Sequence, residues 1–223
     1  MTGLRFPACT LVIACWSISL VAVAADWTSV EAVSAALCVP LLAGAVLVHL
    51  APQRPPAALM VAYAALTIAD LLPDRIFLPN LVALLCYIAI FVQLGAWAQL
   101  QRKPIASFVL LNLIPAGLVT AILTEFGLSA LPAACYAVAL AAMPALATQL
   151  GHWITLGAFA FLVHDVFVAF ALREATSPPY PFAVRAIHLL AQALIACGLV
   201  QLLSKQPVRN RNSSRLRRVR SRW

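Results

Sequence analysis

The chain has 223 residues, of which 64% are hydrophobic and 10% are charged. Soluble domains carry roughly 45–50% apolar and about 25% charged residues, so this composition excludes a soluble enzyme, a nucleic-acid-binding domain and a disulfide-rich secreted module. The formal net charge of +8 comes from the end of the chain, because eight of the fifteen basic residues follow residue 204. The composition predicts a membrane protein with several spanning segments.

Eight apolar runs, separated by proline, glycine and charged residues, predict eight transmembrane helices. They cover residues 7–25, 30–51, 56–73, 78–100, 104–125, 129–148, 153–172 and 181–203. A transmembrane helix needs roughly 20 residues, so a chain of this length has room for about eight. The predicted fold class is therefore all-α, a polytopic membrane bundle in which residues 1–204 form one transmembrane domain.

The first run also has features of a signal peptide, since Arg5 precedes an apolar stretch that ends in Ala22-Val23-Ala24. We expect this run to be retained as a helix, because it is long enough to span a membrane and makes the number of helices even. An even number is what the charges of the connecting segments require.

Basic residues in the connections orient the chain, because cytoplasmic loops are enriched in lysine and arginine. With a cytoplasmic N-terminus, every net-positive connection falls inside and every acidic one outside. The inner residues are Arg5, Arg54, Arg102, Lys103 and the basic tail; the outer ones are Asp26, Glu31, Asp74 with Arg75, Glu125, and Arg173 with Glu174. This pattern predicts that both termini are cytoplasmic and that the protein lies in the cell membrane.

Residues 205–223 hold eight cations and few apolar side chains. Such a segment cannot form a core, so we expect a disordered cytoplasmic tail that lies on anionic membrane lipid. Nucleic acid is not expected as a partner. The sequence leaves the oligomeric state open.

The six cysteines all lie inside apolar runs, without a CxxC pair or a histidine at metal-ligand spacing. We therefore expect them to be small core residues with free thiols. No metal site and no cofactor are predicted.

Asp70 lies in the third apolar run, where Tyr63, Thr67, Asp70 and Asp74 follow helical spacing and form one polar stripe. An ionisable side chain inside a membrane costs at least roughly 2.5–3.5 kcal/mol to insert, so it usually faces the bundle interior. The alternative is that Asp70 lies near the outer interface and is wet. The stripe favours a lined cavity.

Asp165, preceded by His164, lies deep in the seventh run, and His188 and Gln192 share one face of the eighth with Arg185 a turn earlier. These residues predict a polar cavity in the outer half to the middle of the bilayer. The alternatives are structural hydrogen bonding between helices and, for Arg185, snorkelling to the outer surface.

Tyr87 with Gln93 and Asn112 with Pro115 are weaker signals, because polar residues of this kind also join membrane helices. The chain has no GxSxG, HExxH, P-loop or GxGxxG motif. Two intramembrane carboxylates with nearby histidine suit acid–base chemistry in a low-dielectric pocket, where one carboxyl can stay protonated. They also suit a small proton-coupled transporter, and both functions stay open at this point.

Four ordered segments resemble the YhhN-type lysoplasmalogenases, which are eight-helix integral membrane hydrolases. They are residues 65–72 around Asp70, residues 132–143 with Tyr136, residues 156–165 ending in His164-Asp165, and residues 188–195 with His188 and Gln192. The resemblance covers roughly residues 55–203. The chain departs from the family pattern at Ala69, His164 and His188, which replace Gly, Ser and Tyr, and its fourth run lacks the usual histidine.

The resemblance implies hydrolysis of the vinyl-ether bond of a lysoplasmalogen, a lysophospholipid, to a fatty aldehyde and a glycerophospho-base. Protonation at carbon gives an oxocarbenium ion that water captures, which parallels the use of two carboxylates by glycosidases. In this interpretation Asp165, the deeper of the pair, is the acid, and Asp70 holds the water. The residues expected to bind the substrate are His188, Gln192, His164, Tyr87, Asn112 and Arg185.

Overall fold

The computed structural model describes residues 5–50, 56–71, 77–100, 106–125, 127, 129–173 and 181–205. Over these residues the regular secondary structure is helical throughout, which confirms the all-α class. The helices are α1 (Arg5–Ala24), α2 (Thr28–Leu50), α3 (Ala57–Leu71), α4 (Phe77–Gln93), α5 (Ala96–Leu100), α6 (Ala106–Glu125), α7 (Ala130–Ala147), α8 (His152–Arg173) and α9 (Pro181–Lys205). The basic tail after Lys205 and the predicted Asp74 lie outside the described residues.

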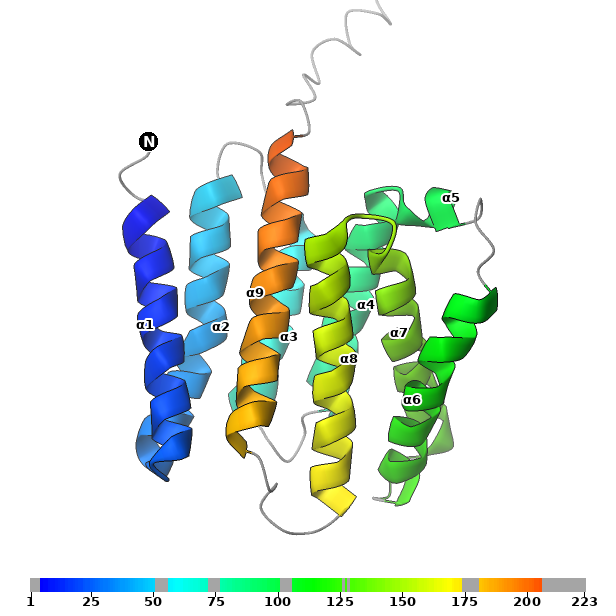
Figure 1. Ribbon diagram of the computed structural model, residues 1–223, viewed down its shortest axis with the longest axis horizontal. Helices are drawn as coiled ribbons and strands as arrows, with labels where there is room; N and C mark the ends of the chain where they lie inside the picture. The colour runs from blue at the N-terminus through cyan, green and yellow to red at the C-terminus, as the bar shows by residue number, and fades with distance from the viewer. Residues whose placement is uncertain are drawn as a thin grey trace, which may run out of the picture.

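The fourth apolar run forms two helices rather than the single one expected. The helix α4 ends where the backbone amides of Leu94 and Gly95 bond to Ile90 and Val92. Gly95 has a φ of 90°, a conformation that glycine adopts without strain and that a continuing helix cannot contain. The five residues of α5 follow in a new direction (Figure 1).

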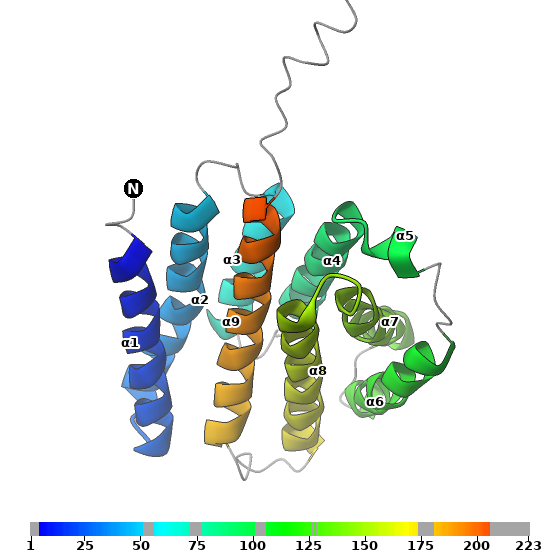
Figure 2. The ribbon, with the colours of Figure 1, turned by 45° about the horizontal axis from the view of Figure 1, so that its top comes forward.

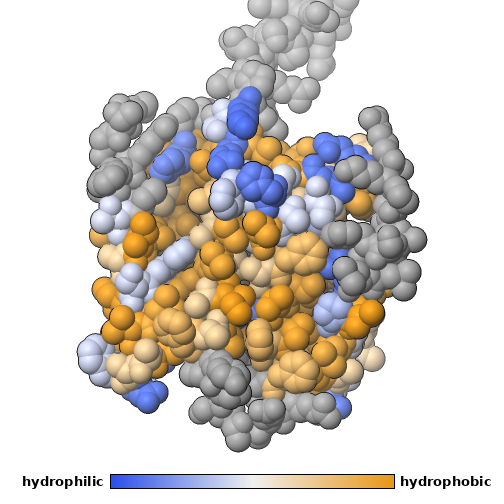
Figure 3. All heavy atoms as spheres, viewed as in Figure 1, coloured by the Kyte–Doolittle hydropathy of each residue, from blue (hydrophilic) through white to orange (hydrophobic). Residues whose placement is uncertain are grey.

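Four helical segments are long and apolar enough to cross a membrane: Thr28–Leu50, Ala130–Ala147, His152–Phe170 and Phe182–Lys205. Other apolar helical segments in the described part of the chain are shorter, among them Ala57–Leu71 and Phe77–Gln93. Hydrophobic residues cover most of the face seen in Figure 3, and hydrophilic ones gather toward its edges. These are features of a membrane protein.

The helices form a bundle in which successive long helices run in opposite directions (Figures 1 and 2). The sequential pairs α1–α2, α3–α4, α6–α7 and α8–α9 pack together, and further contacts join α2 to α3, α4 to α7, and α7 to α8. The last helix, α9, also contacts α1 and α2. The start of α1 and the end of α9 lie at the same end of the bundle (Figure 1).

Two glycines bring α8 and α9 into close contact. A Cβ atom added at Gly157 would lie 2.7 Å from Ile195 Cγ1, 2.8 Å from the Ile195 nitrogen and 2.9 Å from the Ala191 oxygen. A Cβ at Gly198 would meet the side chain of Ile154. Small residues allow membrane helices to approach in this way, and here they fix the register of α8 against α9.

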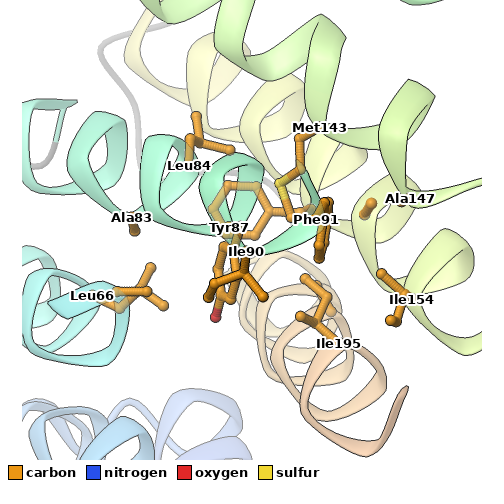
Figure 4. Packing of buried hydrophobic residues seen from close by; sticks show 14 of the residues in the cluster. Leu66, Ala83, Leu84, Tyr87, Ile90, Phe91, Met143, Ala147, Ile154 and Ile195 are labelled. Carbon is orange, nitrogen blue, oxygen red and sulfur yellow. The ribbon is translucent and has the colours of Figure 1, made fainter. Parts of the chain in front are cut away.

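The apolar core fills the space between α3, α4, α7, α8 and α9. Figure 4 shows Tyr87 and Phe91 of α4 among Leu66, Met143 and Ile195. Tyr87 and Phe91 have no exposed surface, and their rings stack with centroids 6.3 Å apart. The Tyr87 hydroxyl brings one polar atom into this otherwise apolar contact.

The described cysteines have free thiols, but they are not all core residues as expected. Cys15 and Cys38 are buried, with their sulfurs 3.7 Å apart. Cys135 and Cys197 are exposed. The expectation failed because a small, weakly polar thiol suits the lipid-facing surface of a membrane helix as well as its interior.

Candidate functional site

Asp165 lies in a buried hydrogen-bonded group between α7 and α8. Its side chain is 4% exposed. The Tyr136 hydroxyl donates to Oδ2 over 2.7 Å, and Nδ1 of His164 lies 3.1 Å from Oδ1. The side chain of Asn80, from α4, also hydrogen-bonds Tyr136. Both carboxylate oxygens therefore have partners that fix the orientation of the side chain.

Two histidine rings lie side by side next to this carboxylate. The ring centroids of His164 on α8 and His188 on α9 are 4.6 Å apart, and each ring also faces Phe161 at about the same distance, 6.1 and 6.2 Å. Both histidines are buried, at 6% exposed. His164 thus connects Asp165 to α9.

Asp70 is paired with Arg185. The Arg185 Nη1 atom donates to Asp70 Oδ1 over 3.2 Å, and its Nε donates to the Ser19 hydroxyl over 3.3 Å. The side chains of Arg185 and Asp70 are 15% and 12% exposed. Arg185 therefore turns inward to an ion pair, and the alternative that it only snorkels to the surface is wrong.

A third polar contact lies deeper along α9. The Tyr87 hydroxyl donates to Gln192 Oε1 over 2.8 Å, and both side chains are buried. Tyr63 of α3 lies close enough to Tyr87 for the two hydroxyl groups to interact electrostatically. Polar side chains thus link α3 to α4 and α4 to α9.

These contacts form two groups that adjoin along one face of α9, where His188 and Gln192 are four residues apart. Together we call them the polar network: Asp70, Arg185, Ser19, His188, His164, Asp165, Tyr136 and Asn80 in the first group, and Gln192, Tyr87 and Tyr63 in the second. His164 interacts electrostatically with Asp70 as well as with Asp165, and Arg185 interacts with His188. The two carboxylates therefore belong to the same electrostatic group, because His164 interacts with both.

Several atoms of the polar network have no protein partner although they are buried. They are Asp70 Oδ2, Arg185 Nη2, both ring nitrogens of His188, Gln192 Nε2, Asn80 Oδ1 and the Tyr63 hydroxyl. Buried polar atoms almost always have a partner, and leaving one unpaired costs roughly 1–3 kcal/mol. These atoms include both charged and neutral donors, which suit a ligand with an anionic group and neutral oxygens.

Seven of the eight predicted site residues belong to the network. The eighth, Asn112, is buried on α6, and the contacts described above do not include it. Among the described residues, no group of three histidine, cysteine, aspartate or glutamate side chains could hold a metal ion. The network therefore offers proton donors, acceptors and charges.

Sequence reasoning did not include Tyr136, Asn80 and Ser19 among the site residues. Tyr136 has a signal that could have been used, since it carries the single hydroxyl group of the otherwise apolar α7. Asn80 follows Pro79 at a helix start, where an asparagine has an ordinary structural explanation. Ser19 lies in the segment with the features of a signal peptide, and it is fully buried against Arg185.

No protein-family model, no curated protein and no solved structure matches this chain.

Proposed function

We propose that this protein is an integral membrane hydrolase of the lysoplasmalogenase type, which cleaves the vinyl-ether bond of a lysoplasmalogen. The observation that carries the proposal is the pair of carboxylates in one buried network, each with a different partner. Asp70 forms an ion pair with a permanent cation, Arg185. Asp165 instead accepts a hydrogen bond from Tyr136 and lies against the ring of His164. One site thus combines a charge-stabilising group with a proton-sharing group.

In the proposed reaction, Asp165 and His164 share the proton that is delivered to the vinyl carbon. The double bond becomes an oxocarbenium ion, whose positive charge the Asp70 carboxylate stabilises. Water then adds to the cationic carbon and returns one proton, and the resulting hemiacetal breaks down to a fatty aldehyde and a free glycerol hydroxyl. General acid–base catalysis of this kind contributes about 10²–10⁴-fold.

The unpartnered atoms supply places for the substrate. Arg185 Nη2 suits the phosphate, because a guanidinium binds phosphate oxygens by charge-assisted hydrogen bonds. His188 and Gln192 follow along the same helix at intervals of three and four residues, and their free nitrogens suit the glycerol oxygens. Charged and neutral groups thus follow one another along α9 in the order of a lysophospholipid head group.

We also propose eight membrane crossings with both termini in the cytoplasm. The alternating helix directions and the shared end of α1 and α9 support this arrangement. The sequence adds the basic residues Arg54, Arg102 and Lys103, which lie outside the described residues and which the charge pattern assigns to the cytoplasmic side. Reporter fusions after residues 28 and 223 should report opposite sides of the cell membrane. Reports from the same side would contradict the topology.

A proton-coupled carrier is the second candidate, and the Asp70–Arg185 pair is the observation that favours it. Protonation of Asp70 would release Arg185, which is a simple way to couple a proton to a movement of α9. The discriminating experiment measures aldehyde release from a lysoplasmalogen by the purified protein. Release above that of a protein-free control supports the hydrolase, and no release contradicts it and favours the carrier.

A further inference from the structure

A small cavity lies between the start of α8 and the end of α9, far from the Asp70–Arg185 end of the polar network. It has a volume of about 160 Å³, and its lining comes from residues 151–154 before and at the start of α8 and from residues within 198–205 at the end of α9. Its lining combines the apolar Ile154 and Leu202 with the polar His152, Gln201 and Lys205. An engineered cavity of about 150 Å³ holds a benzene molecule, so this space is large enough for a phosphate group.

The charge of the lining favours an anion. Lys205 contributes a cation, Gln201 contributes an amide that can donate, and none of the described residues around the cavity is acidic. The chain continues past Lys205 with seven further arginines. Repulsion between these arginines and Lys205 argues against the tail itself as the occupant.

The surroundings of the cavity favour a lipid as the source of that anion. Trp153 lines the cavity and remains 39% exposed, and Leu156, one turn further along α8, is 53% exposed. Tryptophan is enriched at the level of the lipid head groups, and the apolar face beside it suits an acyl chain. In Figure 3, the surface near the end of α9 is hydrophilic, and the surface below it is hydrophobic.

We propose that this cavity binds the phosphate group of an anionic phospholipid, with Lys205 and Gln201 as donors and Trp153 beside the lipid. Basic pockets between membrane helices bind anionic head groups in this way. His152 completes the polar wall, and its ring lies against Trp153 with centroids 4.8 Å apart. The site is independent of the proposed hydrolase activity and would retain one lipid per chain.

Native mass spectrometry of the full-length protein, loaded with phosphatidylglycerol or phosphatidylcholine, tests the site. We expect one phosphatidylglycerol to be retained in preference to phosphatidylcholine. Lys205→Gln should weaken this retention about fivefold, the factor that one basic residue near a membrane surface contributes. Gln201→Trp, which fills the cavity from an exposed position without changing the charge, should weaken it as well.

Two matched variants separate the cavity from the general charge of the tail. Arg209→Gln removes one positive charge from the basic tail. Ser204→Trp adds the same ring at an exposed position of α9 that does not line the cavity. Both should retain the lipid. Equal losses in Lys205→Gln and Arg209→Gln, or full retention in Gln201→Trp, would overturn the site. Displacement by millimolar inorganic phosphate would show an anion site without lipid selectivity and would also overturn the proposal.

Discussion

The two aspartates of the polar network differ in their exposure and in the residues that contact their carboxylate oxygens. Asp165 is 4% exposed and has a partner on each oxygen, the Tyr136 hydroxyl and the His164 ring, neither of which is a permanent charge. Asp70 is 12% exposed and is held by Arg185, whose charge is permanent, while its second oxygen has no protein partner. These two environments correspond to the two roles that we propose, with Asp165 taking part in proton delivery and Asp70 stabilising the cation.

Breaking the ion pair between Asp70 and Arg185 should cause the largest loss of stability. Arg185→Leu leaves the Asp70 carboxylate buried and unpaired, so we expect a loss of roughly 3 kcal/mol, the lower end of the range for breaking a buried pair, because each side chain keeps some exposure. Thermal unfolding of the purified protein measures it. The double variant Arg185→Leu, Asp70→Leu should recover much of the loss. If the double variant is no more stable than the single one, the ion pair does not determine the stability.

The register between α8 and α9 can be disturbed without changing any polar residue. Gly157→Ala places a Cβ atom against the backbone of Ile195 and Ala191, so we expect a destabilisation of about 2 kcal/mol, within the range of overpacked cores. Gly44→Ala is the matched control, because a Cβ atom there meets nothing within 4 Å. Thermal unfolding should show a loss for the first and none for the second. Equal effects would show that the α8–α9 contact is not tight.

Removing the Tyr136 hydroxyl group tests the hydrogen bond that it donates to Asp165. Tyr136→Phe removes a donor to a carboxylate, and Tyr87→Phe removes a donor to a neutral amide. Hydrogen bonds to charged groups contribute about 1.5–3 kcal/mol and neutral ones about 0.5–1.5, so the Tyr136 variant should lose more stability. Thermal unfolding of the two variants makes the comparison. A larger loss for Tyr87→Phe would contradict the expectation that the hydrogen bond to Asp165 is the stronger of the two.

Much of the fold follows from hydropathy, because each apolar run must satisfy its backbone within itself and does so as a helix. The break at Gly95 was not predicted, since it depends on a local φ rather than on hydrophobicity. The polar face of α9 was predicted from the spacing of Arg185, His188 and Gln192. The partner of each of these residues was not predicted. Asp70 and Arg185, for example, are separated by 115 residues, and only the packing of the bundle brings them together.

Asp70 and Asp165 were predicted as site residues because ionisable side chains are costly inside a membrane, while Tyr136 was named only within a segment that resembles the YhhN-type lysoplasmalogenases. A single tyrosine in an apolar helix is consistent with core packing, so its hydrogen bond to Asp165 was not predictable from composition. Residues that act through a contact on another helix are the ones that sequence spacing does not identify.

Aldehyde release from a lysoplasmalogen by Asp70→Asn and Asp165→Asn proteins tests the central claim most directly. Asparagine preserves shape but removes the charge or the shared proton, so we expect each folded variant to lose about 10²–10⁴-fold in turnover. Glu125→Gln, which changes an exposed carboxylate at the end of α6, should keep near-normal turnover. Near-normal turnover by either folded aspartate variant would contradict catalysis by the pair.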